Sequence, residues 1–261
     1  MSKFKTALRY LKYLRKGKSK YFIHSPFVFE FVDEVLFNKH HFYAYDEVEK
    51  RRDLLLISDR KVTVTDFGAG SRVNNDLVKP VSQIAKNAAK PKKYGQLLHR
   101  IVSHYQPETM LELGTSLGIT SMYEASANKS GKLYTHEGCP ETAKIAHGIF
   151  HAYPLKNIEI VVGDFAKTLD NTLSKIDKID YAFFDGNHQK IPTLEYFEKS
   201  LEKAHDQTLF IFDDIHWSDE MEEAWKTIKE HPRVTVTIDL FFIGLVFFKP
   251  DQAKEDFIIR Y

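Results

Sequence analysis

The amino-acid sequence predicts an α/β fold, in which a doubly wound, mostly parallel sheet ends in an antiparallel strand and follows an N-terminal helical extension. From residue 94 onward, strand-like segments alternate with helical segments at spacings of about 20 to 28 residues, the pattern of right-handed βαβ units. The last two strand-like segments have only a short connection, which requires an antiparallel pair. We therefore expect an extension over residues 1–93 and an α/β domain over residues 94–261.

The composition is that of a globular protein, because hydrophobic residues make up 43% of the chain and charged residues 28%. Cys139 is the only cysteine, which excludes an intramolecular disulfide and gives no reason to assume an oxidising compartment. The longest apolar run, Leu240–Phe248, is too short for a membrane helix of about 20 residues. Basic residues also interrupt every apolar stretch near the start, so no signal-peptide core is present. We expect a soluble, cytoplasmic protein.

The first 20 residues form a basic arm. They carry eight Lys or Arg and no acid, so the remainder holds 37 − 8 = 29 bases against 36 acids. Phe4, Leu8, Leu11 and Leu14 recur at helical spacing, which predicts an amphipathic helix. Through residues 3–20 this helix could contact nucleic acid or an anionic membrane surface. Alternatively, its apolar stripe packs on the acidic body while the bases stay in solvent.

The next segments lead to a glycine-rich turn. Residues 24–26 predict a turn before a helix through Val35, residues 46–60 continue as a charged helix, and residues 61–65 alternate as a strand does. The sequence DFGAGS at residues 66–71 resembles a nucleotide-binding loop, but no apolar helix follows it to bind a phosphate. We interpret it as a glycine turn that is either structural or on the substrate side.

The regular alternation begins at Tyr94. A helical stripe from Leu97 to Tyr105 ends before Pro107. The expected parallel strands are Met110–Leu113, Leu133–His136, Ile158–Val162, Tyr181–Phe184 and Leu209–Phe212. The expected helices between them cover about 119–128, 140–152, 165–175, 193–204 and 219–230, and the antiparallel pair is Val234–Asp239 with Phe242–Phe248.

An acidic residue ends each of the five expected parallel strands. In an open α/β sheet, ligands bind outside the carboxyl ends of the strands, so these acids are expected to converge on one crevice. Carboxylates at one edge repel each other unless a cation or hydrogen-bond donors lie among them. S-adenosylmethionine offers a sulfonium, an ammonium, ribose hydroxyls and an adenine amino group, and it suits such a site better than a pyrophosphate does. The acids are Glu112, Glu137, Asp164, Asp185 and the pair Asp213-Asp214.

The first strand leads into the loop that we expect to hold the methionyl part of this cofactor. Gly114 and Gly118 allow the loop backbone to approach the ligand, and Thr115 and Ser116 supply hydroxyls and amides.

Acids after the next two strands are expected to bind the nucleoside part. Glu137, followed by Gly138, is placed to accept hydrogen bonds from both ribose hydroxyls. Asp164 could accept from the adenine amino group while Phe165 flanks the ring. A helix N-cap is the alternative role for Asp164, and both roles are compatible.

Five segments resemble the class I S-adenosylmethionine-dependent methyltransferases, particularly the catechol-type O-methyltransferase branch. They are LELGTSLGITS, LYTHEGCPETAKIA, VVGDF, FFDGNH and IFDDIHW, and the resemblance covers about residues 94–249. It implies a Rossmann-like sheet of seven strands and transfer of a methyl group to an oxygen or nitrogen acceptor, such as a small molecule. It also implies cofactor contacts from Glu112, Gly114, Ser116, Glu137, Asp164 and Asp185.

The resemblance raises the question of a metal. Catechol-type relatives hold Mg²⁺ with an aspartate after the fourth strand and an Asp-Asn pair after the fifth. Here Asp185, Asp213 and Asp214 occupy these places, with Asp instead of Asn at position 214. Hard oxygen ligands suit Mg²⁺ or another divalent cation. Alternatively, Asp185 and Asp213 serve the cofactor and the substrate directly.

Methyl transfer to oxygen or nitrogen requires alignment of the acceptor and loss of a proton. His188, just past the fourth strand, is the first candidate for the base because histidine titrates near neutral pH. Asp213 and His216 come next. Structural hydrogen bonds in loops are the alternative for both histidines.

Three other functional classes stay open. An NAD-dependent oxidoreductase would have the motif G-x-G-x-x-G at the first turn. Here the next glycine after Gly114 is Gly118, so the motif is absent. A metal-dependent hydrolase could use Asp185, His188, Asp213, Asp214 and His216. A non-catalytic membrane-surface or nucleotide-binding module is the third. No motif identifies the methyl acceptor or the oligomeric state.

Overall fold

The computed structural model describes residues 3–65 and 78–261. Two compact units make up the chain. Unit 1 comprises Met1–Phe37 and Ile176–Tyr261, and unit 2 comprises Asn38–Lys175. The glycine turn predicted at residues 66–71 lies outside the described residues. The predicted division of the chain at residue 93 stays a prediction.

Unit 2 contains three parallel strands in the order β3-β4-β5. They are β3 (Thr109–Leu113), β4 (Lys132–Glu137) and β5 (Ile158–Val162), and the helices that follow them are α6 (Ile119–Ala127), α7 (Pro140–Ala152) and α8 (Phe165–Leu173). Leu113 lies beside His136, and Glu137 lies beside Val162. The carboxyl ends of the three strands therefore lie at the same edge, where the predicted cofactor residues of this unit begin.

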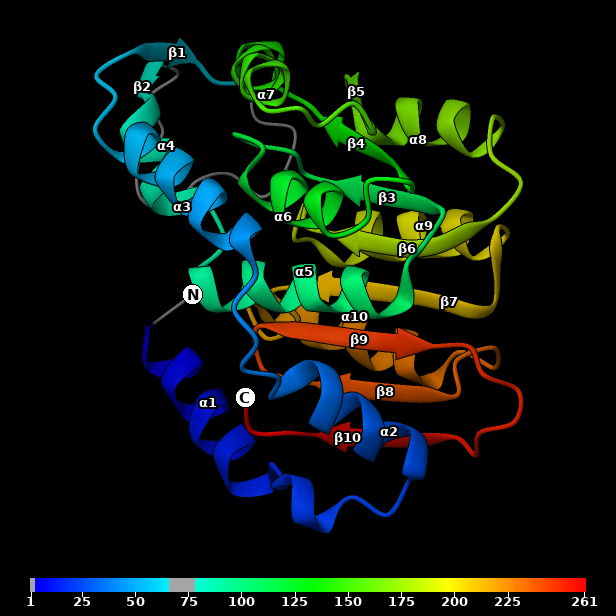
Figure 1. The fold of residues 1–261 in the computed structure, drawn as a ribbon. Coiled ribbons are helices and arrows are strands. Elements are labelled where there is room, and N and C mark those ends of the chain that lie inside the picture. The colour runs from blue at the N-terminus through cyan, green and yellow to red at the C-terminus, as the bar shows by residue number, and fades with distance from the viewer. Residues whose placement is uncertain (1–2, 66–77) are drawn as a thin grey trace. The chain divides into compact units, whose positions relative to one another are not determined.

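The first part of unit 2 is a helical layer with a small antiparallel pair of strands. Its elements are α3 (Tyr43–Leu56), α4 (Val81–Ala88), α5 (Lys92–Tyr105) and the antiparallel strands β1 (Lys61–Thr63) and β2 (Val78–Pro80). Helix α3 packs against α4 and α6, and α5 also packs against α6 (Figure 1). Tyr45, Val48 and Tyr123 are buried where these helices meet.

Unit 1 contains five strands in the order β10-β8-β9-β7-β6. They are β6 (Ile179–Phe184), β7 (Ala204–Asp213), β8 (Val236–Asp239), β9 (Ile243–Phe247) and β10 (Glu255–Ile258). Strand β9 is antiparallel to β7 and β8, whereas the β6–β7 and β8–β10 pairs are parallel. The predicted antiparallel pair near the end of the chain is confirmed.

The later helices of unit 1 are α9 (Lys190–Leu201) and α10 (Asp219–Glu230). The Ser218 hydroxyl accepts a hydrogen bond from Met221 N at 3.0 Å and caps α10, as the sequence predicts. Trp225 of α10 is buried against Gly244 of β9, where a Cβ atom would come within 2.7 Å of the indole. Trp225 is therefore a packing residue.

Helix α2 (Pro26–Phe31) continues into a π-helical turn, Val32–Leu36. The Ser25 side chain caps α2, and Pro26 stands in its first turn. The rings of Phe27 and Phe31 meet Phe247 of β9 with centroid distances of 5.0 and 5.8 Å. These contacts fix α2 on the sheet of unit 1 (Figure 1).

Helix α1 (Lys3–Lys16) attaches to unit 1 differently from the prediction. Leu8 and Leu11 are 50% and 61% exposed, whereas Tyr13 is only 5% exposed. The Tyr13 hydroxyl donates to Ile259 O at 2.5 Å, and Arg9 forms ion pairs with carboxylates of α10. The expectation that the apolar stripe packs on the body is wrong for both leucines, because a tyrosine and an arginine make the contact instead.

The predicted fold class is confirmed by mostly parallel strands, the helices between them and the antiparallel strand β9. The prediction of seven strands is one too few, because β10 adds an eighth. The helix expected over 193–204 ends at Leu201, since Ala204 pairs with Ile179 and already belongs to β7. Across residues 3–65 and 78–261, no helix combines the length and apolar character needed to cross a membrane.

Candidate active site

The loop between β3 and α6 lies against the end of β4. Gly114 N and Thr115 N donate to His136 O at 2.9 and 3.0 Å, and Gly118 N donates to Thr115 O at 2.8 Å. Gly118 has φ of 81°, and a Cβ atom there would come within 2.6 Å of the Phe150 ring. This position therefore needs glycine both for its backbone conformation and for close packing.

Glu112, the last residue but one of β3, is fully buried. Its Oε2 accepts hydrogen bonds from the hydroxyls of Ser121 and Thr135, the latter at 2.6 Å. Its Oε1 has no hydrogen-bond partner within the described part of the chain. Burial raises the pKa of Glu112 to about 7, the two hydroxyl donors oppose this, and the charge of Glu137 adds to it. A buried oxygen of this kind fits an N–H donor of a ligand.

Glu137, the last residue of β4, organises the backbone around the glycine loop. Its Oε2 accepts from Ser116 N at 2.7 Å, and its Oε1 accepts from Cys139 N at 2.8 Å, on the far side of half-buried Gly138. These two hydrogen bonds tie the end of β4 to the glycine loop and to the start of α7.

Asp164 caps α8 by accepting a hydrogen bond from Ala166 N at 3.1 Å, so its predicted N-cap role is confirmed. Phe165 presents its ring edge-on to His136 with a centroid distance of 6.2 Å. His136 is itself structural, because both ring nitrogens meet threonine hydroxyls of α8 and burial lowers its pKa to about 4. The predicted adenine contacts of Asp164 and Phe165 stay predictions.

In unit 1, Asp185 and Asp213 extend from neighbouring strands. Phe184 of β6 and Phe212 of β7 are partners in the parallel register, and their rings stack at 4.5 Å. The next residue on each strand is an aspartate, so the two carboxylates lie side by side at the carboxyl edge. Asp213 is only 1% exposed.

His188 joins these two aspartates. One ligand atom from each of Asp185, His188 and Asp213 lies within 4.8 Å of the others, and His188 Nε2 is 3.8 Å from Asp185 Oδ1. Two carboxylates suit Mg²⁺ and Mn²⁺, while an imidazole suits Mn²⁺, Fe²⁺ or Zn²⁺. The donor set therefore fits a divalent cation that accepts mixed oxygen and nitrogen ligands.

Asp214 is not part of this three-residue group. Its backbone has φ of 52°, its N donates to Phe242 O at 2.6 Å, and its O accepts from Trp217 N at 2.8 Å. Asp214 therefore turns the chain after β7, and His188 stands with the two aspartates in its place. The resemblance to an Asp-Asn pair points to position 214, whereas the three-residue spacing of Asp185 and His188 is the local sign of this group.

His216, the other candidate base, lies in a cluster of carboxylates in unit 1. Its Nδ1 is 2.9 Å from Glu222 Oε1, its Nε2 is 2.8 Å from Asp239 Oδ2, and its ring stacks on Phe241. Burial alone would lower the pKa of His216, but the two carboxylates outweigh it and raise the pKa. Both ring nitrogens of His216 are engaged in these contacts, which argues against His216 as the base.

The candidate residues thus fall into two groups, each within one unit. Unit 2 holds the glycine loop with Glu112, Glu137, Asp164 and Phe165, and unit 1 holds Asp185, His188, Asp213 and His216. The expectation that all five strand ends converge on one crevice involves both units and stays a prediction.

The central part of the chain is similar to a known protein family. Residues 111–215 match the model of a methyltransferase domain. No curated protein matches the sequence.

Solved structures share the fold. An O-methyltransferase from Bacillus cereus in complex with SAH is 18% identical with a TM-score of 0.57, over 84% of this chain and 96% of that one. A Podospora anserina methyltransferase bound to SAH is 12% identical with a TM-score of 0.60, over 87% and 97%. A structure described as a putative O-methyltransferase from Klebsiella pneumoniae is 17% identical with a TM-score of 0.56, over 81% and 92%.

Proposed function

We propose that this chain transfers a methyl group from S-adenosylmethionine to an oxygen or nitrogen atom of a small-molecule acceptor, because residues 111–215 match the model of a methyltransferase domain. The fold that the chain shares with O-methyltransferases supports this proposal. So does the SAH bound in two of these structures, since SAH is the demethylated product of this donor.

The observation that carries the proposal is the buried carboxylate of Glu112. One of its oxygens accepts from Ser121 and Thr135, and the other has no described partner. S-adenosylmethionine supplies an electrophilic methyl group on a sulfonium, and its ammonium and ribose hydroxyls are donors. We assign Glu112 and the loop with Gly114, Thr115, Ser116 and Gly118 to its methionyl part.

Glu137 is assigned to the ribose, and replacing it tests this role. Glu137→Ala is expected to weaken binding of S-adenosylmethionine and SAH by about 1 to 3 kcal/mol, because polar hydrogen bonds to the ligand are lost. Isothermal titration calorimetry measures the change. Glu137 also supports the loop backbone, so Glu137→Gln, which keeps one acceptor oxygen, shows how much of the loss is structural.

The matched control is Glu141→Ala, because Glu141 is an exposed acid in the first turn of α7. The Glu141→Ala variant should bind S-adenosylmethionine and SAH with the affinity of the wild type. Unchanged affinity in Glu137→Ala would refute the ribose role. If the wild type binds neither ligand, the methyltransferase proposal itself fails, and an NAD-dependent oxidoreductase, a metal-dependent hydrolase or a non-catalytic module takes its place.

For Asp185, His188 and Asp213 we propose a divalent cation, Mg²⁺ or Mn²⁺. The proximity of their ligand atoms supports this. Such a cation would polarise an acceptor hydroxyl and favour loss of its proton. Without a cation, His188 is the residue that takes this proton. Its ring lies beside Asp185, whose carboxylate stabilises the positive charge that the imidazole gains.

Asp213→Asn separates these two roles. The variant is expected to lose Mn²⁺ binding in a calorimetric titration by about tenfold or more, because one anionic ligand becomes neutral. The control is Asp206→Asn, since Asp206 is an exposed aspartate of the same strand. Equal Mn²⁺ binding in wild type and Asp213→Asn, or full turnover after chelation with EDTA, would contradict the metal role and leave His188 as the base.

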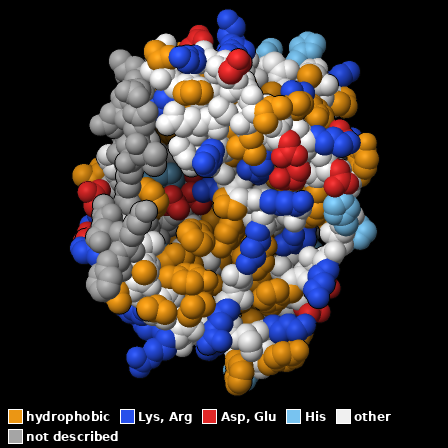
Figure 2. Space-filling view, turned by 90° about the vertical axis from the view of Figure 1, so that its left-hand side faces the viewer, with side chains coloured by type: hydrophobic (Ala, Val, Ile, Leu, Met, Phe, Trp, Pro, Cys, Tyr) orange, Lys and Arg blue, Asp and Glu red, His pale blue; other side chains and the backbone are white. Residues whose placement is uncertain are grey.

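Helix α1 is a candidate for binding to an anionic membrane surface. Leu8 and Leu11 are exposed beside Lys12 and Arg15, which are exposed as well. Figure 2 shows hydrophobic and basic side chains next to one another on the side of the molecule where Figure 1 draws α1. Exposed leucines favour an anionic membrane surface over nucleic acid. Sedimentation with phosphatidylserine vesicles tests this, and recovery of all protein in the supernatant would exclude it.

A further inference from the structure

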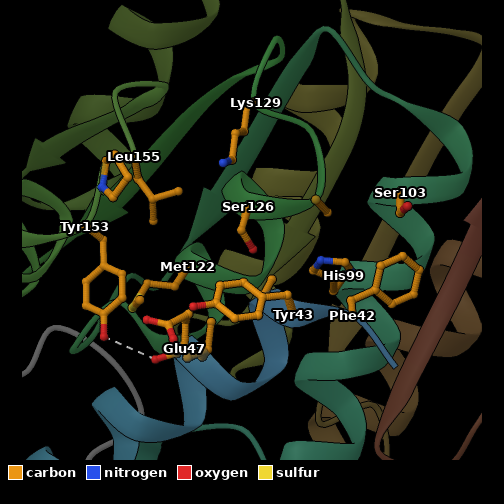
Figure 3. Close-up of a pocket in the computed structure, with 14 residues that line it drawn as sticks. Phe42, Tyr43, Glu47, His99, Ser103, Met122, Ser126, Lys129, Tyr153 and Leu155 are labelled. Atoms are coloured by element: carbon orange, nitrogen blue, oxygen red, sulfur yellow. Dashed lines mark hydrogen bonds between the residues drawn. The ribbon is translucent and has the colours of Figure 1, made fainter. Parts of the chain in front are cut away.

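A cavity of about 440 Å³ lies among the helices of unit 2. Its walls come from four segments: the start of α3 with the residue before it, α5, α6 with the loop that follows it, and the loop after α7, which includes Leu155. Figure 3 shows the labelled side chains of these four segments arranged around this space. Its volume falls within the range of small-molecule pockets, about 300 to 1,000 Å³.

The cavity is separate from the glycine loop. Helix α6 begins at Ile119, directly after that loop, and its last residues, Ser126 and Ala127, line the cavity. A helix of nine residues rises by about 13 Å at roughly 1.5 Å per residue. The cavity also reaches back along α6 to Met122, but none of the residues that line it belongs to the glycine loop or is Glu112 or Glu137. The proposal for this cavity therefore does not depend on where the methyl donor binds.

Aromatic and apolar side chains form most of the cavity wall. Phe42, Tyr43, Met122 and Leu155 line it, and Phe42 lies on the side of His99 in Figure 3. The two charged side chains at the cavity, Glu47 and Lys129, lie on opposite sides of it in the same view. A charged ligand would be attracted by one of these two side chains and repelled by the other. An uncharged aromatic ligand therefore fits the cavity better.

His99 of α5 is the buried polar group of this cavity. It is only 2% exposed, and its Nδ1 has no hydrogen-bond partner in the part of the chain that the structure describes. The rings of Phe42 and Tyr45 pack against the imidazole at 4.7 and 5.0 Å. Figure 3 shows the ring directed toward the space between Tyr43 and Ser126.

At neutral pH this imidazole is uncharged. Burial, with a smaller effect from Arg100, lowers the pKa of His99 to about 4. A neutral imidazole has one nitrogen that donates and one that accepts. Leaving a buried ring nitrogen without a partner costs free energy, which a ligand with a complementary group recovers.

We propose that this cavity is a second ligand site, which binds a small, uncharged aromatic molecule through a hydroxyl or ring N–H hydrogen bond to His99. The aromatic ring of the ligand packs against Phe42, Tyr43 and Met122. The site is distinct from the place of the methyl donor, so both ligands bind at the same time.

The test uses 2-naphthol as the probe and 2-methoxynaphthalene, which lacks the donor, as its matched partner. Both are titrated into the full chain in the presence of saturating SAH, and crystals are soaked with 2-naphthol. We expect 2-naphthol in the cavity within hydrogen-bond distance of His99. We also expect it to bind about tenfold more tightly than the methoxy compound, as one hydrogen bond predicts.

Two variants locate the binding. His99→Phe keeps an aromatic ring but removes the acceptor, so it should abolish the difference between the two probes, while His104→Phe, at an exposed position of the same helix, should not. Ser126→Trp fills the cavity from its half-buried edge and should prevent binding of both probes. A cooperative thermal unfolding transition in each variant shows that it is folded.

The proposal is overturned if 2-naphthol does not bind at millimolar concentration. It is also overturned if Ser126→Trp binds the probe as the wild type does, or if His99→Phe retains the full preference for 2-naphthol.

Discussion

Glu112 makes the free energy of unfolding depend on pH. Its carboxyl keeps its proton up to about pH 7 in the folded chain, whereas an unfolded glutamate loses it near pH 4.3. The folded state therefore binds more protons between these values, and the stability that Glu112 contributes falls as the pH rises through this window. Above about pH 7 the buried carboxylate is charged, and the free-energy cost of burying that charge is fully present.

Glu112→Gln removes this dependence. At pH 8 and without ligand, we expect the free energy of unfolding of the variant to exceed that of the wild type by about 1 to 3 kcal/mol. Its melting temperature should therefore be higher. The gain should vanish near pH 4. Thermal melts across this pH range measure it, with Glu141→Gln as an exposed control. A variant that is less stable than the wild type at pH 8 would show that the charged carboxylate already has a partner in the ligand-free protein.

At the residue scale, the sequence predicted which acids end the strands because strand ends follow from local pattern. Asp185 and Asp213 were found in this way, and the structure brings them together. The contacts of His216 were not predictable, because its partner Asp239 lies 23 residues further along the chain and meets it only through the packing of β8. A histidine in a loop gives no local sign of such a contact.

At the scale of elements, the turn between β3 and α6 depends on Gly118. Gly118→Ala places a methyl group against Phe150 in a left-handed backbone conformation, and we expect a loss of about 1 to 3 kcal/mol in stability. The matched control is Gly148→Ala in α7, where a Cβ atom has nothing within 4 Å. That change should stabilise the protein by about 0.5 to 1 kcal/mol. Urea unfolding compares the two, and equal stabilities would contradict the packing argument.

Long elements with a clear apolar period were predicted within a few residues, and α7 and α10 match their expected bounds. Short elements were missed, since four residues such as β10 show too little alternation to be recognised. The start of β7 was not predicted as strand: Ala204 was expected to end a helix and residues 205–208 were given no element, but pairing of Ala204 with Ile179 begins the strand there. A long-range partner decides the structure there, and local propensity does not show it.

At the scale of the whole molecule, the two ends of the chain meet in unit 1. Lys18 N donates to Ile258 O at 2.8 Å, and Arg260 Nε donates to Leu14 O at 3.0 Å. Arg9, with its side chain 11% exposed, pairs with Asp219 and Glu222 of α10. The first helix is thus held by residues from the last fifth of the sequence.

Arg9→Ala should loosen α1 without unfolding the protein. We expect trypsin to cleave within α1 about tenfold faster, which corresponds to a loss of roughly 1.4 kcal/mol in local stability. Arg15→Ala, at an exposed position of the same helix, is the control, and mass spectrometry of timed digests locates the cuts. SAH affinity should be unchanged, and equal cleavage rates in both variants would show that the ion pairs do not hold the helix.

The division of unit 1 into Met1–Phe37 and Ile176–Tyr261, with all of unit 2 between them, also sets an order during synthesis. The ribosome completes the segment of unit 2 while the sheet of unit 1 does not yet exist, and domains fold as units as they emerge. Helix α1 is made before unit 2, whereas its partners Asp219, Glu222 and Ile259 are made after unit 2. During that interval Arg9 and Tyr13 lack the partners that they have in the folded protein.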